Sequence, residues 1–362
     1  MTKILLGRRA AIGVCSTLLA AIPGLCRGET SLQVRDLLIE QRLDGKWQRI
    51  ITAKESAKYR REILANMERV MGPLPGREKR SPLDVKVERE ETAGSFTRRK
   101  LTYQSAPGER VPAWLLIPNR VEKRSPAMLV LHQTTKFGKD EAAGLAGLPN
   151  LHLGSELAER GYVVLAPDYP TLGEYEIDVY AHGWQSATMK AIWDNIRGID
   201  LLQLLSEVDG KRIGVIGHSL GGHNSLFTAA FDTRIQCAVT NCGFTSFARY
   251  YGGNLTGWWG PRYLPRIKTE FPTPDRMPFD FHDVLGAIAP RAVYVSAPEH
   301  DSNFDVTGVR DVVASVEPIY KAFHASDRFK AVYPDCAHDW PPAERMAAYA
   351  WVDRQLRHAA TP

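Results

Sequence analysis

Residues 217–222 read Gly-His-Ser-Leu-Gly-Gly, and no other stretch constrains the fold of this chain as strongly. They match the G-x-S-x-G pattern, follow the apolar run 212–216 and open a helix-like stretch at 220–231. Glycines at 217 and 221 allow the strand and helix backbones to come close, while the strained turn lifts the serine hydroxyl above the sheet edge. The pattern predicts that Ser219 is a nucleophile, and the alternative is a chance glycine-rich connection.

Composition places the chain among large globular proteins. Of its 362 residues, 44% are hydrophobic and 24% are charged, which is enough apolar material for a large core. The formal charge of +5 is spread among interleaved acidic residues rather than gathered in a basic stripe. We therefore expect one large domain with additions and no nucleic-acid partner.

The first 28 residues have the layout of a signal peptide. Lys3, Arg8 and Arg9 precede the apolar run 10–25, and a polar stretch follows with a cleavage point near residues 26–28. The run is short and rich in small residues, so a membrane anchor is the alternative and no stable span is expected after removal. We expect export to the periplasm or the exterior, by the twin-arginine route or by ordinary secretion.

Cysteine usage gives no sign of a disulfide framework. Cys15 and Cys26 fall in or beside the expected signal peptide, which leaves Cys237, Cys242 and Cys336. An odd number argues against paired bridges, and Cys237 lies in an apolar strand. Neither C-x-x-C nor H-E-x-x-H occurs, so the sequence predicts no metal site.

The order of the remaining segments predicts an α/β fold. Residues 29–82 have helical spacing and are expected to form a structural N-terminal extension, whereas 83–118 alternate as antiparallel strands do. Helix-like segments at 151–160, 186–208, 220–231 and 343–356 then alternate with buried-strand runs at 127–131, 162–166, 213–216, 235–240, 292–296 and 329–333. This pattern predicts a doubly wound, mostly parallel sheet that begins with antiparallel strands and places its site beyond the carboxyl ends of the parallel strands.

Residues 244–283 interrupt this alternation. The segment is long, rich in Gly and Pro, and carries Tyr250, Tyr251, Trp258, Trp259, Tyr263 and Phe271. We expect a cap inserted over the site, and the alternative is a packed excursion without substrate contact. Trp184, Tyr251, Trp258 and Trp259 are candidates for stacking on a sugar or aryl ring of the substrate.

A serine nucleophile needs a general base, and the base needs an acid that fixes its tautomer. His338 is the best candidate base because it follows the last expected strand, whereas His218 and His223 belong to the turn and its helix. The loop after 292–296 offers Glu299, Asp301 and Asp305 as the acid. Spacing favours Asp301, whose neighbours Ser302 and Asn303 could hydrogen-bond to the carboxylate. Asp335 and Asp339, which flank His338, are interpreted as loop-capping residues.

The developing oxyanion needs two preorganised N–H donors. The backbone of Leu220 supplies one at the start of the helix, and the amide of Gln133 or Thr134 is the candidate for the second. His132, at the end of the same strand, is expected either to shape the site and contact substrate or simply to pack. Lys136, Lys139 and Asp140 in the following loop are interpreted as solvated, and contact with substrate is the alternative.

The order of these motifs resembles the α/β-hydrolase superfamily over residues 83–356. Within it, Leu-His-Gln-Thr-Thr at 131–135, Ala-Pro-Asp-Tyr at 166–169, the Ser219 motif and Cys-Ala-His-Asp at 336–339 resemble dienelactone-hydrolase-like and acetyl-xylan-esterase-like proteins. Gln133 departs from this pattern, because many members have glycine there. The resemblance also assigns the acid to Asp301, and it implies an esterase or a related hydrolase that needs no cofactor.

These features favour a secreted serine hydrolase that cleaves carboxylic esters, with acetyl or carbohydrate esters among its possible substrates. A serine peptidase of the prolyl-oligopeptidase type is the first alternative, although the N-terminal residues are too few and too helical for the propeller domain that such enzymes usually carry. A catalytically silent binding protein with the same fold is the second.

Overall fold

The computed structural model describes residues 53–120 and 124–359, and the expected signal peptide lies outside this part of the chain. Within these ranges one sheet holds nine strands in the order β1-β2-β3-β5-β4-β6-β7-β8-β9. The strands are β1 (Lys86–Ala93), β2 (Phe96–Ala106), β3 (Glu109–Pro118), β4 (Ser125–Leu131), β5 (Val163–Pro167), β6 (Val208–His218), β7 (Ile235–Asn241), β8 (Ala292–Ser296) and β9 (Phe329–Val332). No helix in the described ranges is both long and apolar enough to cross a membrane.

The sheet has an antiparallel part and a parallel part. β1, β2, β3 and β5 pair antiparallel in turn, and every pair from β5 through β4 to β9 is parallel. The chain winds from β4 outward to β5 and then returns to β6 on the other side of β4. Sheets of this kind bind ligands in a crevice at such a reversal, which here falls at the carboxyl ends of β4 and β6.

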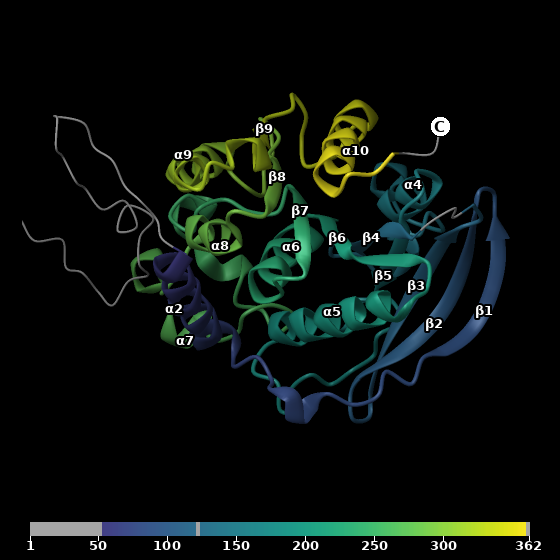
Figure 1. Ribbon diagram of the computed structural model, residues 1–362. Coiled ribbons are helices and arrows are strands. Elements are labelled where there is room, and N and C mark those ends of the chain that lie inside the picture. The colour runs from purple at the N-terminus through teal and green to yellow at the C-terminus, as the bar shows by residue number, and fades with distance from the viewer. Residues whose placement is uncertain (1–52, 121–123, 360–362) are drawn as a thin grey trace, which may run out of the picture.

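Helices cover both faces of the sheet, as predicted for a doubly wound fold (Figure 1). Alternate residues of β4 face opposite ways, so that Leu129 joins one apolar cluster while Met128 and Val130 join the other. The larger cluster includes residues of α2 (Ala53–Met71), α5 (Ala187–Leu204), α6 (Leu220–Phe231), α8 (Phe281–Ile288) and α9 (Val306–Ala322). The smaller one is covered by α4 (Leu153–Glu159) and α10 (Pro342–Leu356).

Two of these helices, α8 and α9, are not among the predicted elements. Helix α9 nevertheless carries helical spacing at Val309, Val312, Val313 and Val316, which are all buried. Asp280 begins α8 with a capping box that it shares with Asp283. The cap segment therefore ends where α8 begins, at the edge of the range expected from the sequence.

The described part of the N-terminal extension contains α2 and the 3₁₀ turn Arg77–Lys79. Tyr59, Ile63 and Met67 recur at helical spacing and are buried. The Tyr59 hydroxyl donates to Asp283 Oδ1 at 3.1 Å, and Arg60 donates to the carbonyl of Ala230 at 2.6 Å. These contacts bind helix α2 to the helices α6 and α8, in line with a structural role.

The edge strand β1 is exposed along most of its length and carries charges of both signs. Arg98 and Arg99 of β2 pair with Glu91 and Glu90 across the hairpin. A register shift between Val87 and Arg89 marks a bulge in this strand.

Residues 242–280 form an irregular layer with the short helix α7 (Ile267–Glu270) and the 3₁₀ turns Tyr250–Gly252, Leu255–Gly257 and Pro274–Arg276. Its interior is aromatic: the Trp258 ring lies 5.6 Å from that of Phe247 and 5.7 Å from that of Tyr250, between centroids. These rings belong to the larger apolar cluster, so the segment is packed on the body of the molecule, as the packed-excursion alternative requires. It also reaches the candidate site, since the Tyr263 and Thr134 hydroxyls hydrogen-bond at 2.9 Å.

Candidate active site

The turn between β6 and α6 holds Ser219 in a strained backbone conformation, with φ 54° and ψ −117°. A Cβ added to Gly217 would lie 2.3 Å from the carbonyl oxygen of Gly221, and one added to Gly221 would lie 1.9 Å from that of Leu131. Both contacts are impossible, so both positions require glycine. The Ser219 N–H donates to the carbonyl of Asn241 at 2.9 Å, which ties the turn to the end of β7. This is the strand–turn–helix geometry that the sequence predicts.

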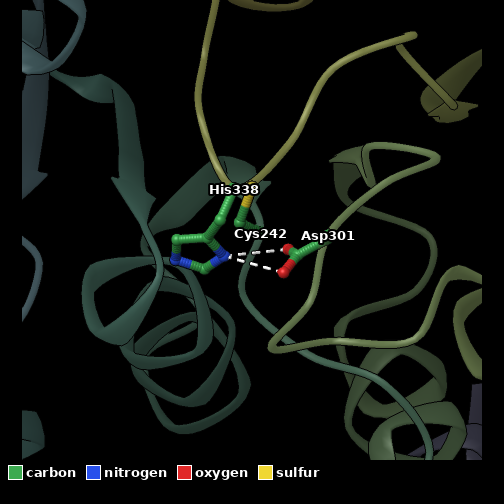
Figure 2. Close-up of side chains that lie close together, drawn as sticks. All are labelled: Cys242, Asp301 and His338. Carbon is green, nitrogen blue, oxygen red and sulfur yellow. Dashed lines mark hydrogen bonds and ion pairs between the residues drawn. The ribbon is translucent and has the colours of Figure 1, made fainter.

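His338 and Asp301 come together from the loops that follow β9 and β8 (Figure 2). Nδ1 of His338 lies 2.9 Å from each carboxylate oxygen of Asp301. The backbone N–H groups of Asn303 and Phe304 donate to Oδ1 of the same carboxylate at 2.8 and 3.1 Å. Backbone donors thus take the place of the Ser302 and Asn303 side chains expected from the sequence.

Electrostatics keep Asp301 ionised. Burial raises the pKa of its carboxyl, but the hydrogen bond and charge of His338 and the two backbone N–H donors outweigh burial and leave the pKa below its usual value. An ionised Asp301 accepts the Nδ1 proton of His338. The other ring nitrogen, Nε2, is then free to act as a base.

The other carboxylates near His338 are engaged elsewhere. Glu299 pairs with Arg310, and Asp305 caps α9 by accepting from the N–H of Thr307 at 2.8 Å. Two further carboxylates hold the loop itself: Asp335 pairs with His300 at 2.8 Å, and Asp339 accepts from Asn150 at 2.8 Å. Asp301 alone among these residues has its carboxylate against the His338 ring.

His218 and His223 are buried histidines rather than bases. Burial is the main cause that lowers the pKa of each to about 3, and for His218 the nearby charge of His338 contributes to this value. Asn241 Nδ2 lies 2.7 Å from His218 Nδ1, and the His218 and His338 rings meet edge to face with centroids 4.7 Å apart. His218, which precedes Ser219 in the chain, therefore packs against the His338 ring.

The candidate oxyanion donors lie at the crevice between β4 and β6. Leu220 is the first residue of α6, where a backbone N–H has no acceptor within the helix. Across the crevice the Gln133 side chain donates to Glu141 Oε1 at 3.1 Å. This bond and the Thr134–Tyr263 bond anchor both ends of the short segment that would supply the second N–H.

Comparisons with known proteins find hydrolases that resemble this chain in sequence and in fold. The pattern of the prolyl oligopeptidase family matches residues 152–284. The chain is 27% identical to YtaP, a candidate hydrolase of Bacillus subtilis (strain 168), over 302 residues that cover 80% of this chain and 97% of YtaP. A glucuronoyl esterase from Solibacter usitatus superposes with a TM-score of 0.70 at 22% identity, covering 88% of this chain and 97% of the esterase.

The chain has the fold of the α/β-hydrolases and is similar in sequence to hydrolases of this kind. The resemblance to dienelactone hydrolases and acetyl esterases is confirmed by two shorter matches, each covering 25% of this chain at 36% identity. They are to a candidate carboxymethylenebutenolidase of Saccharomyces cerevisiae (strain S288c), of which 37% is covered, and to the acetyl esterase Axe7A of Xylanibacter ruminicola, of which 20% is covered.

The two substrate-binding candidates that lie outside the cap segment, His132 and Trp184, are packed inside the molecule. His132 is buried, with Nδ1 2.6 Å from the carbonyl oxygen of Gln133 and Nε2 accepting from the N–H of Tyr169 at 2.9 Å. Trp184 is also buried and donates to Glu109 Oε2 at 3.0 Å. Both side chains hold neighbouring loops in place, and neither is part of the binding surface proposed below.

The cap aromatics divide into interior and surface residues. Trp258 is 3% exposed and packs in the larger apolar cluster, where its ring contacts that of Phe281 in α8. Tyr251 is 60% exposed, and its hydroxyl donates to Asn303 Oδ1 at 3.2 Å, two residues from Asp301. Trp259 is partly buried against the core. Tyr251 and Trp259 are therefore the predicted residues that still offer aromatic surface.

The solvated interpretation of the loop after β4 fails for Lys139. Its side chain is fully buried, and Nζ lies 3.0 Å from Asp168 Oδ2 and 2.9 Å from Glu174 Oε2. Asp140 accepts a hydrogen bond from Trp114 Nε1 at 2.7 Å. An internal ion pair of this kind cannot be read from loop composition, because its partners are about 30 residues away in the sequence.

Sequence reasoning also misses Cys242, which lies beside His338 and Asp301 (Figure 2). The residue directly follows β7, at the same sheet edge as Ser219, and its N–H donates to the carbonyl of Ser296 at 3.0 Å. Its φ of 49° differs from that of an extended strand. The position immediately after a buried parallel strand is the signal that could have drawn attention to it.

Proposed function

We propose that this protein is a serine esterase that cleaves carboxylic esters of carbohydrates through an acyl-enzyme on Ser219. The observation that carries the proposal is the His338–Asp301 pair, with Nδ1 2.9 Å from both carboxylate oxygens, beside the strained Ser219 turn. Export of the protein, expected from residues 1–28, is part of the same proposal.

In the proposed mechanism, Ser219 Oγ attacks the ester carbonyl while Nε2 of His338 takes the hydroxyl proton. Asp301 stabilises the imidazolium that forms, and the N–H of Leu220 donates to the oxyanion. His338 then gives the proton to the departing alcohol. Water, activated by the same histidine, hydrolyses the acyl-enzyme and restores Ser219.

The substrate class rests on the relatives and on the exposed surface near the acid loop. The relatives include proteins named acetyl esterase and glucuronoyl esterase. The Tyr251 ring, exposed and tied to Asn303, offers a flat apolar surface close to Asp301 on which a sugar ring could stack.

Labelling by a fluorophosphonate probe and a substrate panel test the proposal. The purified chain should be labelled at Ser219, should hydrolyse acetyl, aryl or sugar esters, and should lose both properties in Ser219→Ala while circular dichroism stays unchanged. Ser225→Ala is a matched control, because Ser225 is buried in α6 and bonded to the carbonyl of Gly221. Unlabelled wild-type protein would instead indicate a catalytically silent binding protein.

A peptidase of the prolyl-oligopeptidase type is the second candidate, favoured by the family match over residues 152–284. Peptidases and esterases share the same nucleophile chemistry, so labelling cannot separate them. Matched ester and anilide substrates with the same acyl group can. Faster cleavage of the anilide than of the ester would contradict the esterase proposal.

A further inference from the structure

Cys242, Asp301 and His338 form a cluster of three different metal-binding side chains (Figure 2). One ligand atom from each, namely the thiol sulfur, a carboxylate oxygen and a ring nitrogen, lies within 4.8 Å of the others. The three residues come from the end of β7 and from the loops after β8 and β9, so the sheet itself brings them together. The catalytic proposal assigns no role to the thiol.

We propose that this cluster binds a soft or borderline divalent cation such as Zn²⁺, and that the bound metal switches the enzyme off. The inhibitory part rests on the proposed function, whereas binding itself does not. The site would be an inhibitory one, distinct from a catalytic metal centre, because the metal would occupy the space between the base and its acid.

The donor set fits zinc. Thiolate, imidazole and carboxylate are the three side-chain types that hold Zn²⁺, usually in tetrahedral sites. The two anionic ligands cancel the charge of the ion, which matters because Cys242 is 2% and Asp301 9% exposed. The His338 side chain is 25% exposed and leaves an open side from which a water could complete the tetrahedron.

Neighbouring groups already orient these ligands. Asn241 Nδ2 donates to the sulfur of Cys242 at 3.3 Å, and the same amide nitrogen donates to the carbonyl of Asp339 at 3.1 Å. Backbone N–H groups of Asn303 and Phe304 hold the Asp301 carboxylate. Outer contacts of this kind strengthen metal sites by fixing ligand direction.

Filling the site changes the tautomer of the base. The metal takes the place of the proton on His338 Nδ1, and that proton moves to Nε2, so the neutral ring keeps one proton. The Cys242 thiol releases its own proton to solvent, and one proton leaves overall. With Nε2 protonated, His338 can no longer accept the proton of Ser219, and turnover stops.

Metal binding can be measured without hydrolysis, by adding Co²⁺ to the Ser219→Ala protein. We expect the near-ultraviolet charge-transfer absorption of a cobalt–thiolate bond. The band should disappear in Ser219→Ala/Cys242→Ser and weaken in Ser219→Ala/Asp301→Asn. It should persist in Ser219→Ala/Cys336→Ser, because Cys336 supplies the nearby thiol that the site does not use.

Inhibition is the second readout, with each variant compared with its own metal-free rate. Zn²⁺ should inhibit the wild type, a chelator should restore the rate, and Mg²⁺, which prefers oxygen ligands, should have no effect. Cys242→Ser should raise the Zn²⁺ concentration for half-inhibition about tenfold or more, and Cys336→Ser should leave it unchanged.

Unaltered Zn²⁺ inhibition of Cys242→Ser, or a cobalt band that survives this substitution, would overturn the inferred site. If the Cys242 variant does not fold, the Ser219→Ala/Asp301→Asn protein provides the test, and an undiminished cobalt band in that protein would also overturn the inferred site. A protein that binds Co²⁺ through Cys242 but cleaves no ester would leave the site standing and refute the proposed function instead.

Discussion

At the scale of single residues, the candidate site depends on charges placed around one imidazole. Asp301 stays ionised because two backbone N–H groups and His338 offset its burial, and the ionised carboxylate selects the Nδ1–H tautomer of His338. His218 stays neutral because its burial lowers its pKa to about 3. A neutral neighbour at a ring distance of 4.7 Å does not repel the imidazolium that forms during turnover.

Replacement of the acid tests this arrangement. Asp301→Asn keeps the size of the side chain but favours the wrong histidine tautomer, so kcat should fall by about three to four orders of magnitude with little effect on folding. Steady-state kinetics on an activated acetyl ester provide the measurement. Glu299→Gln serves as the matched control and should stay near wild type, because Glu299 is paired with Arg310. Loss of activity in Glu299→Gln with a normal Asp301→Asn would move the acid to Glu299.

At the scale of elements, buried parallel strands and the glycine-rich turn could be predicted from the sequence because local patterns encode them. The run 127–131 corresponds to β4. The turn at Ser219 requires its two glycines because a Cβ at either position would clash with neighbouring backbone atoms. The burial of Lys139, and the choice between the two roles considered for His132, could not be predicted, because their partners Asp168 and Tyr169 come from the next strand end. Such pairings become visible only when the sheet is assembled.

The cap shows the same limit, since aromatic composition does not say which rings face inward. Tyr251→Ala should raise KM for sugar esters without changing the free energy of unfolding, because the ring is 60% exposed and borders the acid loop. Trp258→Ala should instead cost about 3–5 kcal/mol of stability, as expected for a buried indole. Michaelis kinetics and urea unfolding of both variants make the comparison. If Tyr251→Ala leaves KM unchanged for every sugar ester tested, the result would contradict substrate contact by Tyr251 and favour a packed excursion over a cap.

At the scale of the whole molecule, the sheet and its two helical layers keep several ionisable groups away from water, and this couples folding to pH. His223 is buried in α6, and its Nε2 has no hydrogen-bond partner among the described residues. Burial lowers its folded-state pKa to about 3, while an unfolded chain titrates near 6.5. Between these values the unfolded state binds the extra proton, so stability falls as pH decreases from about 6.5 towards 3.

His223→Gln should remove this contribution. At about pH 5 the difference in unfolding free energy between wild type and variant should change by about 1.4 kcal/mol per pH unit, with the wild type losing stability faster on acidification. Urea denaturation at several pH values measures both slopes. His300→Gln is a suitable control, because His300 is exposed and paired with the exposed Asp335. Parallel slopes for wild type and His223→Gln would show that His223 is already protonated in the folded protein.

The charged edge strand β1 affects how readily this protein associates with other copies of itself. An open sheet edge offers unpaired backbone groups to which a second chain could add as another strand. On β1 the exposed charges of Lys86, Glu88 and Arg89 would have to lose water as the newcomer approaches, and the bulge between Val87 and Arg89 interrupts the regular spacing that strand addition needs. Edge-to-edge aggregation is thereby discouraged at this edge of the sheet, and neutralising these side chains would favour the addition of a second chain there.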